Sequence, residues 1–396
     1  MLVVGHDPAS GRPLVAGDED HCLVLGPPRS GKTTGKLVPS ILTHTGPLVV
    51  ASSKPDVLAA TAAHRWRDGP VWIVSLMPVD LGRGSPIRIA AWSPLPGCAD
   101  WDTALRRARS LTTARAGEGD ESSRFFRTQA VRVLAALLQA AALGGLAMED
   151  VARWPLLGDL DEPVRLLRER GTPWAAAVLQ GIDGQDPRLR DSVLATASEM
   201  LQVYDSEHAR RQASGTLLDL SAFLRSAGTV YVIAPSEVQE QFANIVVGFL
   251  DDLCRTAYGE PGVGTLLLVL DEADKIAPWP ALPNVLGEGG SQGVQIQMCV
   301  QDLSQARARW GEATDGFPTL FRHKVLLPGV ADRATLEGLS AVLGEEVVPG
   351  ASDSGQRPLW PPHRLAAPPP GTAVHIDGVH AQLVRVVRHH DLGGHR

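Results

Sequence analysis

Two groups of residues in this chain could together bind and hydrolyse a nucleoside triphosphate. The first group lies in residues 26–33, GPPRSGKT, which fit the pattern GxxxxGK[ST]. In such a loop the glycines let backbone amides surround phosphate groups, the lysine reaches the outer phosphates, and the last hydroxyl ligates Mg²⁺. We therefore predict a phosphate-binding loop in which Lys32 is catalytic and Thr33 holds the metal. The residues that we expect to bind the nucleotide here are Gly26, Pro27, Pro28, Arg29, Ser30, Gly31, Lys32, Thr33 and Thr34.

The second group is the acidic pair Asp271 and Glu272, which follows the apolar run 266–270. A phosphate-binding loop needs a metal-holding acid at the end of a neighbouring strand. We expect Asp271 to bind the nucleotide complex by holding Mg²⁺ through water, and Glu272 to polarise the attacking water as a general base. Carboxylates paired in this way are typical of ATPases with an extra strand between the two motifs. The strands that begin near Leu48 and Val230 are available for that place.

A polar residue ends the next apolar run as well. Gln301 follows residues 294–300, and a side chain there can sense the γ-phosphate and orient water. We predict a catalytic role for Gln301, although a solvent-facing strand end would give the same pattern. Gln305, one helical turn later, is a weaker candidate.

Residues 53–56, SKPD, resemble the guanine-reading sequence [NT]KxD of GTPases. In a GTPase this sequence comes after the metal-binding aspartate, whereas here it precedes Asp271 by more than half of the chain. The order is therefore wrong for GTP specificity, and we predict ATP with Mg²⁺ as the bound cofactors.

Strands and helices that alternate along the chain must position these residues. Alternation predicts a parallel sheet with helices on its faces. Asp56 is placed to cap the helix 57–66. The expected strands are 22–25, 47–51, 71–75, 229–233, 266–270, 294–300 and 324–327, and the expected helices of this part are 33–43, 57–66 and 238–258. Residues 349–370 read as a proline-rich loop, and residues 373–376 and 382–387 as a closing hairpin.

Residues 101–204 carry helical spacing and no strand pattern, with helices expected at 104–112, 123–143, 163–170 and 192–203. The predicted fold class is α/β: a RecA-like P-loop ATPase domain with a mostly parallel sheet, helices on both faces and an inserted all-α domain. The expected domains are 1–100, the first part of the ATPase; 101–205, the all-α insertion; and 206–396, the second part of the ATPase.

Composition limits the alternatives. The 396 residues are 44% hydrophobic, which excludes disorder for most of the chain, and no run reaches the roughly 18 apolar residues of a membrane span. The four cysteines form no CxxC pair, which disfavours zinc sites and disulfides and favours reduced thiols in a cytoplasmic protein.

A net charge of −7 excludes a generic nucleic-acid-coating protein, so binding of DNA would need a local basic patch. Two arginine clusters are candidates, although a solvated helix face explains each more simply: Arg106, Arg107 and Arg109, and Arg124, Arg127 and Arg132.

Taken together, these segments resemble the TraG/TraD-type coupling ATPases of conjugative type IV secretion, and the actinobacterial branch in particular. The likeness covers nearly the whole chain. It is carried by residues 26–36 with Pro39 and Leu42, by 270–278 (LDEADKIAP), 293–295, 301–305 and 309–311, and by 326–332 and 336–344.

The resemblance implies a motor that passes single-stranded DNA, often as a relaxase nucleoprotein, to the membrane components of a conjugation or type IV secretion channel. It also implies a homo-hexameric ring whose all-α domain faces the cytoplasm. Members usually begin with a membrane-spanning domain, whereas this phosphate-binding loop already opens at Gly26. Three explanations stay open: another subunit supplies the anchor, the chain is truncated, or the protein works in solution. We expect a chain that lacks the N-terminal membrane domain and is cytoplasmic, recruited to the inner face of the membrane by a partner.

Two further departures bear on the site. Ser52 stands where many members have a strand-end aspartate, and residues 289–293 lack the arginine with which some members reach a neighbouring site. Arg307, Arg309 or Arg322 could substitute for it. Two other functions stay open: an FtsK/HerA-like motor with another cargo, and a non-catalytic, nucleotide-gated cargo adaptor.

Overall fold

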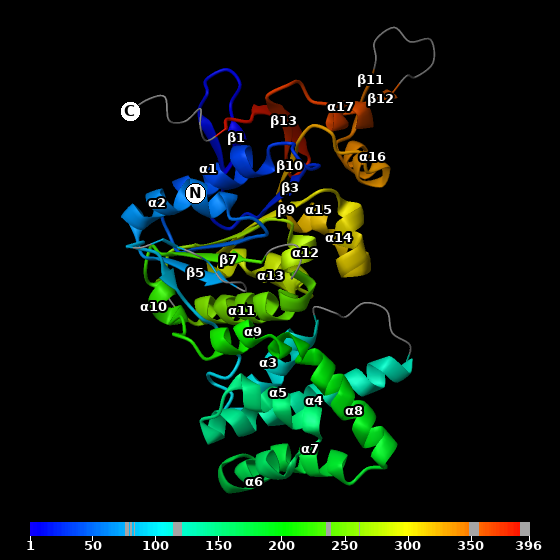
Figure 1. Cartoon of the computed structure of the whole chain (residues 1–396). Helices are drawn as coiled ribbons and strands as arrows, with labels where there is room; N and C mark the ends of the chain where they lie inside the picture. Colours follow the sequence, from blue (N-terminus) through cyan, green and yellow to red (C-terminus); the bar gives the residue numbers. More distant parts are fainter. Residues whose placement is uncertain are drawn as a thin grey trace.

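Strands from both ends of the sequence meet in one twisted sheet, and the middle of the sequence forms a separate group of helices (Figure 1). The computed structural model describes residues 1–75, 79, 81–82, 84–113, 121–234, 239–260, 262–347 and 356–388. The predicted start of a helix at residue 238 and the first part of the predicted loop, 349–355, lie outside these residues. The sheet has 12 strands in the order β2-β1-β14-β13-β10-β3-β9-β8-β4-β7-β5-β6.

The section of the sheet from β10 to β6 is parallel, and the strands beyond β10 are antiparallel. The mostly parallel α/β sheet predicted from the sequence is therefore confirmed. The parallel strands are β10 (His323–Leu326), β3 (Cys22–Leu25), β9 (Val294–Val300), β8 (Leu266–Leu270), β4 (Leu48–Ser52), β7 (Thr229–Ile233), β5 (Val71–Ser75) and β6 (Arg88–Ile89). The antiparallel strands are β13 (Thr372–Asp377), β14 (His380–Arg385), β1 (Leu2–His6) and β2 (Pro13–Ala16).

Apolar side chains cover both faces of this parallel section. Along β8, Leu266, Leu268 and Leu270 pack on one face, while Leu267 and Val269 pack on the other. Alternate residues of a strand point to opposite faces, so an unbroken apolar run fits a sheet buried on both sides. In Figure 1, α1 (Val38–Thr43) and α2 (Asp56–Asp68) cover the upper face, and α11 (Gln239–Gly259) and α13 (Leu282–Glu288) cover the lower face.

Two local predictions need correction. Asp56 is the first residue of α2 rather than its cap, since Pro55 takes the capping position and no side chain caps the helix. The helix expected from residue 33 begins as a π-helical turn, η1 (Thr33–Leu37), before α1. Pro39 cannot donate to the carbonyl four residues earlier and would clash with it, which disfavours a continuous α-helix there.

Among the described residues from Trp101 to Leu224, the regular elements are all helices. One isolated β-bridge, between Leu217 and Ala91, involves this segment. Helix α4 lies at the centre of this group, with residues 133–141 buried on all sides. The helices are α3 (Trp101–Thr113), α4 (Glu121–Gly144), α5 (Met148–Leu157), α6 (Asp161–Arg170), α7 (Pro173–Asp183), α8 (Pro187–Met200), α9 (Glu207–Ala213) and α10 (Leu220–Leu224). The domain boundaries stay a prediction, because α9 and α10 follow residue 205 before β7 begins.

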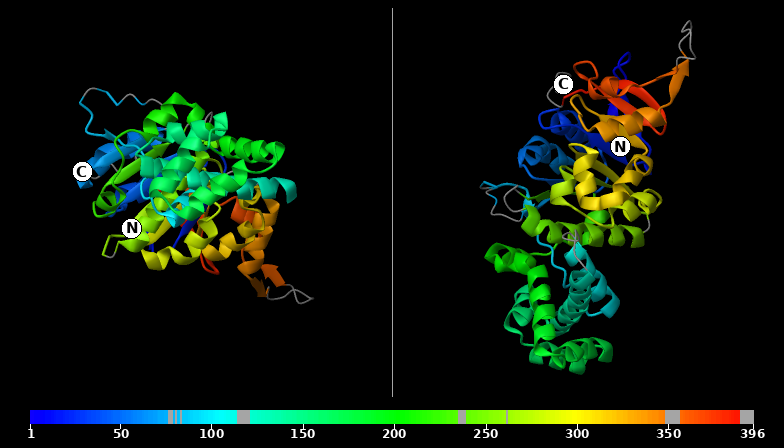
Figure 2. Two further views of the ribbon diagram at one scale, coloured as in Figure 1. Left: turned by 90° about the horizontal axis from the view of Figure 1, so that it is seen from below. Right: turned by 90° about the vertical axis from the view of Figure 1, so that its right-hand side faces the viewer.

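The remaining short elements lie around the sheet. Helices α12 (Ala273–Ile276), α14 (Leu303–Trp310) and α15 (Phe317–Leu320) follow the ends of β8 and β9, and α16 (Arg333–Val342), α17 (Pro362–Ala366) and the small pair β11 (Glu345–Val347) and β12 (Gln356–Pro358) follow β10. The right-hand view of Figure 2 shows the helical group below the sheet and this last segment at the opposite end.

A buried ion pair connects the helical group to α11, the helix under the sheet. Arg107 of α3 is only 6% exposed and forms an ion pair with Asp252 of α11. Its guanidinium lies 5.5 Å from the ring centroid of Trp92, whose Nε1 donates to Asp252 Oδ2 at 3.2 Å. The sequence favoured a solvated helix face for the cluster that includes Arg107, and for this residue that prediction is wrong, because α11 covers it.

We expect Arg107→Ala to lower the free energy of unfolding by about 3 kcal/mol, because it leaves Asp252 under α3 without its cation. Chemical denaturation of the purified protein measures this loss. Arg106→Ala is the matched control, since Arg106 is only half-buried and its side chain bonds to Thr103 Oγ1 at 3.1 Å on its own helix. The control should change stability by about 0.5 kcal/mol or less. Equal stability of the two variants would contradict a structural role for this ion pair.

Candidate nucleotide-binding site

The predicted phosphate-binding loop connects β3 to η1 at the carboxyl edge of the sheet. Its backbone is tied to the neighbouring strand, because Gly26 N donates to Val300 O at 3.2 Å. Two residues of the loop have left-handed backbone conformations, Arg29 with φ 64° and Gly31 with φ 94°. This conformation costs an L-residue such as arginine roughly 1–2 kcal/mol, so the loop is held in a strained shape by its surroundings.

Lys32 lies inside the loop. It is 9% exposed, and its Nζ donates to the carbonyl oxygens of Gly26 and of Pro27, the latter at 3.0 Å. The same ammonium acts on the carboxylate of Asp271 and favours its ionised form. Lys32 and Asp271 are therefore brought within electrostatic reach of each other, although 238 positions of sequence separate them.

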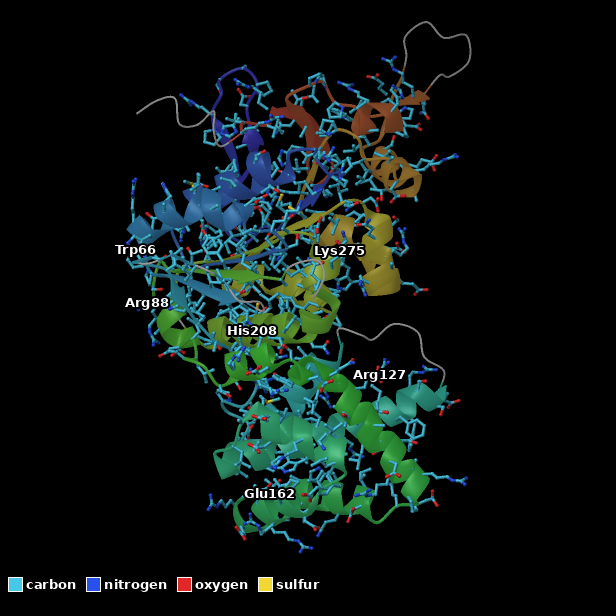
Figure 3. All side chains as sticks on the ribbon, viewed as in Figure 1. Trp66, Arg88, Arg127, Glu162, His208 and Lys275 are labelled. Atoms are coloured by element: carbon cyan, nitrogen blue, oxygen red, sulfur yellow. The ribbon has the colours of Figure 1, made fainter. Side chains whose placement is uncertain are left out.

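The two acidic residues stand at the end of β8 in different environments. Asp271 is 7% exposed, and its pKa is raised, first by burial and then by the neighbouring Glu272 carboxylate. Glu272 is more exposed and has a left-handed backbone, with φ 50° and ψ 50°. That turn directs the two successive carboxylates differently, so one is buried and the other stands near Lys275, whose Nζ lies 3.8 Å from Glu272 Oε2. Figure 3 labels Lys275 at this edge of the sheet.

Two hydroxyl groups complete this acidic corner. Ser52 Oγ donates to Asp271 Oδ2 at 3.2 Å, and Ser53 Oγ donates to Glu272 Oε2 at 3.3 Å. From the sequence, Ser52 is only a departure from the family pattern, and Ser53 has no predicted role at this site. The information that could have found them is that β4 and β8 are parallel neighbours, so their last residues meet. The SKPD segment therefore begins against the carboxylates.

One strand, β9, lies between β3, which leads into the phosphate-binding loop, and β8, which ends at the acidic pair. We expected β4 or β7 in this place, and that prediction is wrong. The order β3-β9-β8-β4-β7 places both of those strands on the far side of β8. The chain leaves β8 through α12 and α13 and returns on the side of the phosphate-binding loop. Gln301, which follows β9, consequently stands between the loop and Asp271. Its Oε1 accepts a hydrogen bond from Gln305 Nε2 at 3.2 Å, so the stronger and the weaker candidate are neighbours.

The three arginines considered for a neighbouring site differ in their partners. Arg307 is paired with Asp315 at 3.2 Å and Arg322 with Asp377 at 2.8 Å. Arg309 acts electrostatically on the buried carboxyl of Asp274, two residues after Glu272. Of the three, Arg309 is therefore the one whose charge reaches the segment that carries the acidic pair.

The oxygen atoms available here suit magnesium. Mg²⁺ is commonly bound by one or two carboxylates together with water and substrate phosphates. Asp271 offers a buried carboxylate that Ser52 orients, and Thr33 offers a hydroxyl at the start of η1. Within the residues that the structure describes, no group of three or more His, Cys, Asp or Glu could hold a metal ion.

Known families match both halves of this site. Residues 4–153 match the family described as type IV secretory system conjugative DNA transfer, and residues 265–364 match the family described as the TraM recognition site of TraD and TraG. A conjugal transfer protein TraG from Escherichia coli is 24% identical over an alignment of 326 residues that covers 73% of this chain and 49% of that protein. Its counterpart from Agrobacterium fabrum is 22% identical, over 74% of this chain and 45% of that protein. The chain thus spans about half the length of the curated relatives it matches.

Solved structures agree with the fold. The bacterial conjugative coupling protein TrwB, in a form in complex with sulphate, superposes with a TM-score of 0.75 at 19% identity, over 98% of this chain and 89% of that one. TrwB in complex with ADP and Mg²⁺ gives the same TM-score at 19% identity, over 96% and 87%. VirB4 of Thermoanaerobacter pseudethanolicus is more distant, with a TM-score of 0.55 at 13% identity, over 99% and 97%. No helix in the described ranges combines the length and the apolar character needed to cross a membrane.

We expect Asp271→Asn to stabilise the nucleotide-free protein by about 1 kcal/mol at neutral pH, because it removes a buried negative charge and keeps an acceptor for Ser52. The raised pKa means that the folded state holds the proton more tightly than the unfolded state. Wild-type stability should therefore fall as pH rises from about 3.9, the ordinary carboxyl pKa, through the raised value.

The variant's advantage should accordingly be absent at acid pH and complete near neutrality. Denaturant titrations across this range measure it, with the exposed Asp315→Asn as control. An Asp271→Asn protein that is less stable than wild type at neutral pH would show that the buried charge is compensated.

Proposed function

Because this chain belongs to the TraG/TraD-type coupling proteins, we propose that it is an ATP-hydrolysing motor that passes single-stranded DNA, free or joined to a relaxase, to a conjugation or type IV secretion channel. The observation that supports hydrolysis best is the convergence of Lys32, Gln301 and the Asp271–Glu272 pair at one edge of a parallel sheet. Its active form in this proposal is a homo-hexamer that partner proteins recruit to the cytoplasmic face of the membrane.

Each residue has a separate task in the proposed reaction. The amides of the loop and Lys32 hold the phosphates, and Thr33 and Asp271 hold Mg²⁺. Bound magnesium supplies positive charge that stabilises the phosphoryl group during transfer. Glu272 takes a proton from water as the water oxygen bonds to the γ-phosphorus and the bond to the bridging oxygen of ADP breaks. Gln301, between the two halves of the site, orients that water.

Glu272 is suited to this base role by its surroundings. Its side chain is 24% exposed, so water reaches it, whereas Asp271 beside it is buried. Ser53 and Lys275 both contact its Oε2 oxygen and hold the carboxylate in place. Asp271, the other acidic side chain bonded at this end of β4, is buried, so Glu272 is the specific choice for a test of the base.

We expect Glu272→Gln to lower ATP turnover by about 10²–10⁴-fold while ATP still binds, because glutamine keeps the shape but cannot take the proton. Lys32→Ala should instead weaken binding of the nucleotide itself. Glu288→Gln at the end of α13 makes the same charge change on an exposed side chain and should leave turnover unchanged. Steady-state phosphate release and binding of a fluorescent ATP analogue separate the two effects. Wild-type turnover in Glu272→Gln would remove it from the mechanism.

The cargo needs its own experiment. ATP turnover should rise when single-stranded DNA is added, and less when duplex DNA of the same sequence is added. The same samples, measured by mass photometry with ATP and DNA, should show growth toward a hexamer. A rate that responds to neither DNA form would argue for an adaptor or for a motor with a protein cargo, and a strict monomer with full activity would argue against a site shared between subunits.

A further inference from the structure

Helix α4 begins with an aromatic pair flanked by arginines that the nucleotide site does not use. Phe125 is 47% exposed, and its ring centroid lies 5.5 Å from that of Phe126 in an edge-to-face arrangement with 78° between the planes. Phe126 is partly buried and packs against the main apolar cluster. The inner ring therefore supports the outer one, and the outer ring presents a large apolar surface to solvent.

Positive charge lies along the same helix face. Arg124, Thr128 and Arg132 are four residues apart and exposed, so with 3.6 residues per turn they form one stripe beside Phe125. The stripe is about 12 Å long at 1.5 Å per residue. Glu121 lies on this face as well, one turn before Arg124. Among the described residues neither Arg124 nor Arg132 takes part in an ion pair, which leaves both guanidinium groups able to bind an anion.

The other arginine cluster on the helical group has a different role. Arg107 is buried in the ion pair with Asp252, and Arg106 bonds to Thr103 on its own helix. The first turns of α4 instead project from the body, on the same side of the molecule as α14, the helix that follows Gln301 (Figure 1). Figure 3 labels Arg127 on these projecting turns. Aromatic surface and available positive charge thus coincide here, on the side where the nucleotide site lies.

We propose that Arg124, Phe125, Thr128 and Arg132 form a binding site for single-stranded DNA, in which an unpaired base stacks on Phe125 while the arginines hold the phosphates on either side of it. This assignment rests on the proposed function and names a place where the strand is held. Stacking of bases on aromatic side chains is tolerant of sequence, and arginines beside the ring add phosphate and cation–π contacts. A duplex offers no free base face, so the ring selects single strands.

The test measures binding of a fluorescent oligothymidylate by the whole protein at several salt concentrations. Phe125→Ala should weaken binding by about 5- to 150-fold, the range expected for loss of one stacked base, and Phe125→Tyr should restore it. The double variant Arg124→Ala/Arg132→Ala should flatten the dependence of log affinity on log salt by about 1.4, since each phosphate contact on a single strand contributes about 0.7. Binding of duplex DNA should respond little to Phe125→Ala.

Two matched controls are available within the helical group. Trp174 is 57% exposed on α7, a helix with no basic residue, so Trp174→Ala removes an exposed aromatic without the charge stripe. Arg188→Ala removes one exposed arginine at the start of α8. Both should bind oligothymidylate as wild type does, and thermal unfolding of all variants verifies that they are folded.

The outcomes separate this assignment from the proposed function. If wild type binds single strands and Phe125→Ala binds equally well, the α4 site is wrong while the coupling function stands. If Phe125→Ala loses an associated protein but no DNA, the surface docks a protein and the assignment is also overturned. If wild type binds no single strand at all, the proposed cargo fails together with the site. A selective loss in Phe125→Ala, recovered by Phe125→Tyr, supports both.

Discussion

The parallel pairing of β3, β9, β8 and β4 is the constraint on which the rest of this structure depends. In parallel pairing the carboxyl ends of neighbouring strands meet at one edge, so the residues that follow the strands become neighbours whatever their distance in sequence. Lys32, Gln301, the Asp271–Glu272 pair and Ser52 each follow or end one of these strands. The geometry of the site is thus a consequence of backbone hydrogen bonds, and it requires all four strands to be in register.

The candidate site also contains residues whose charge burial or backbone conformation is energetically unfavourable. Asp271 is a carboxylate buried beside a second carboxylate, and Arg29 and Glu272 are the two non-glycine residues with positive φ among those described. Each state would be avoided in a purely structural region, because it lowers stability. The apolar side chains on both faces of the sheet and the buried Arg107–Asp252 ion pair stabilise the fold and offset this loss of stability.

Much of this arrangement could be predicted from the sequence, and the rest fails for definite reasons. The loop between β3 and η1 and strands β3, β8 and β9 follow from local spacing and unbroken apolar runs. The position of β9 between β3 and β8 does not, because strand order depends on how the chain crosses the sheet.

The hairpin of β1 and β2 was not predicted, since Gly5 interrupts its short apolar run. That glycine is needed because a Cβ there would lie 2.6 Å from Val384, a contact with the far end of the chain. The role of Ser53 and the burial of Arg107 likewise depend on partners from other elements.

The outermost strands have a consequence for how copies of this chain could meet. One edge of the sheet ends in β6, which is two residues long, and the other in β2, which begins with Pro13. A short edge or one that contains proline presents few free backbone groups, so a second chain has little opportunity to extend the sheet. Contacts between copies would then be made by side chains, which can separate and reform without breaking a β-ladder. Such edges disfavour irreversible edge-to-edge aggregation of the sheet.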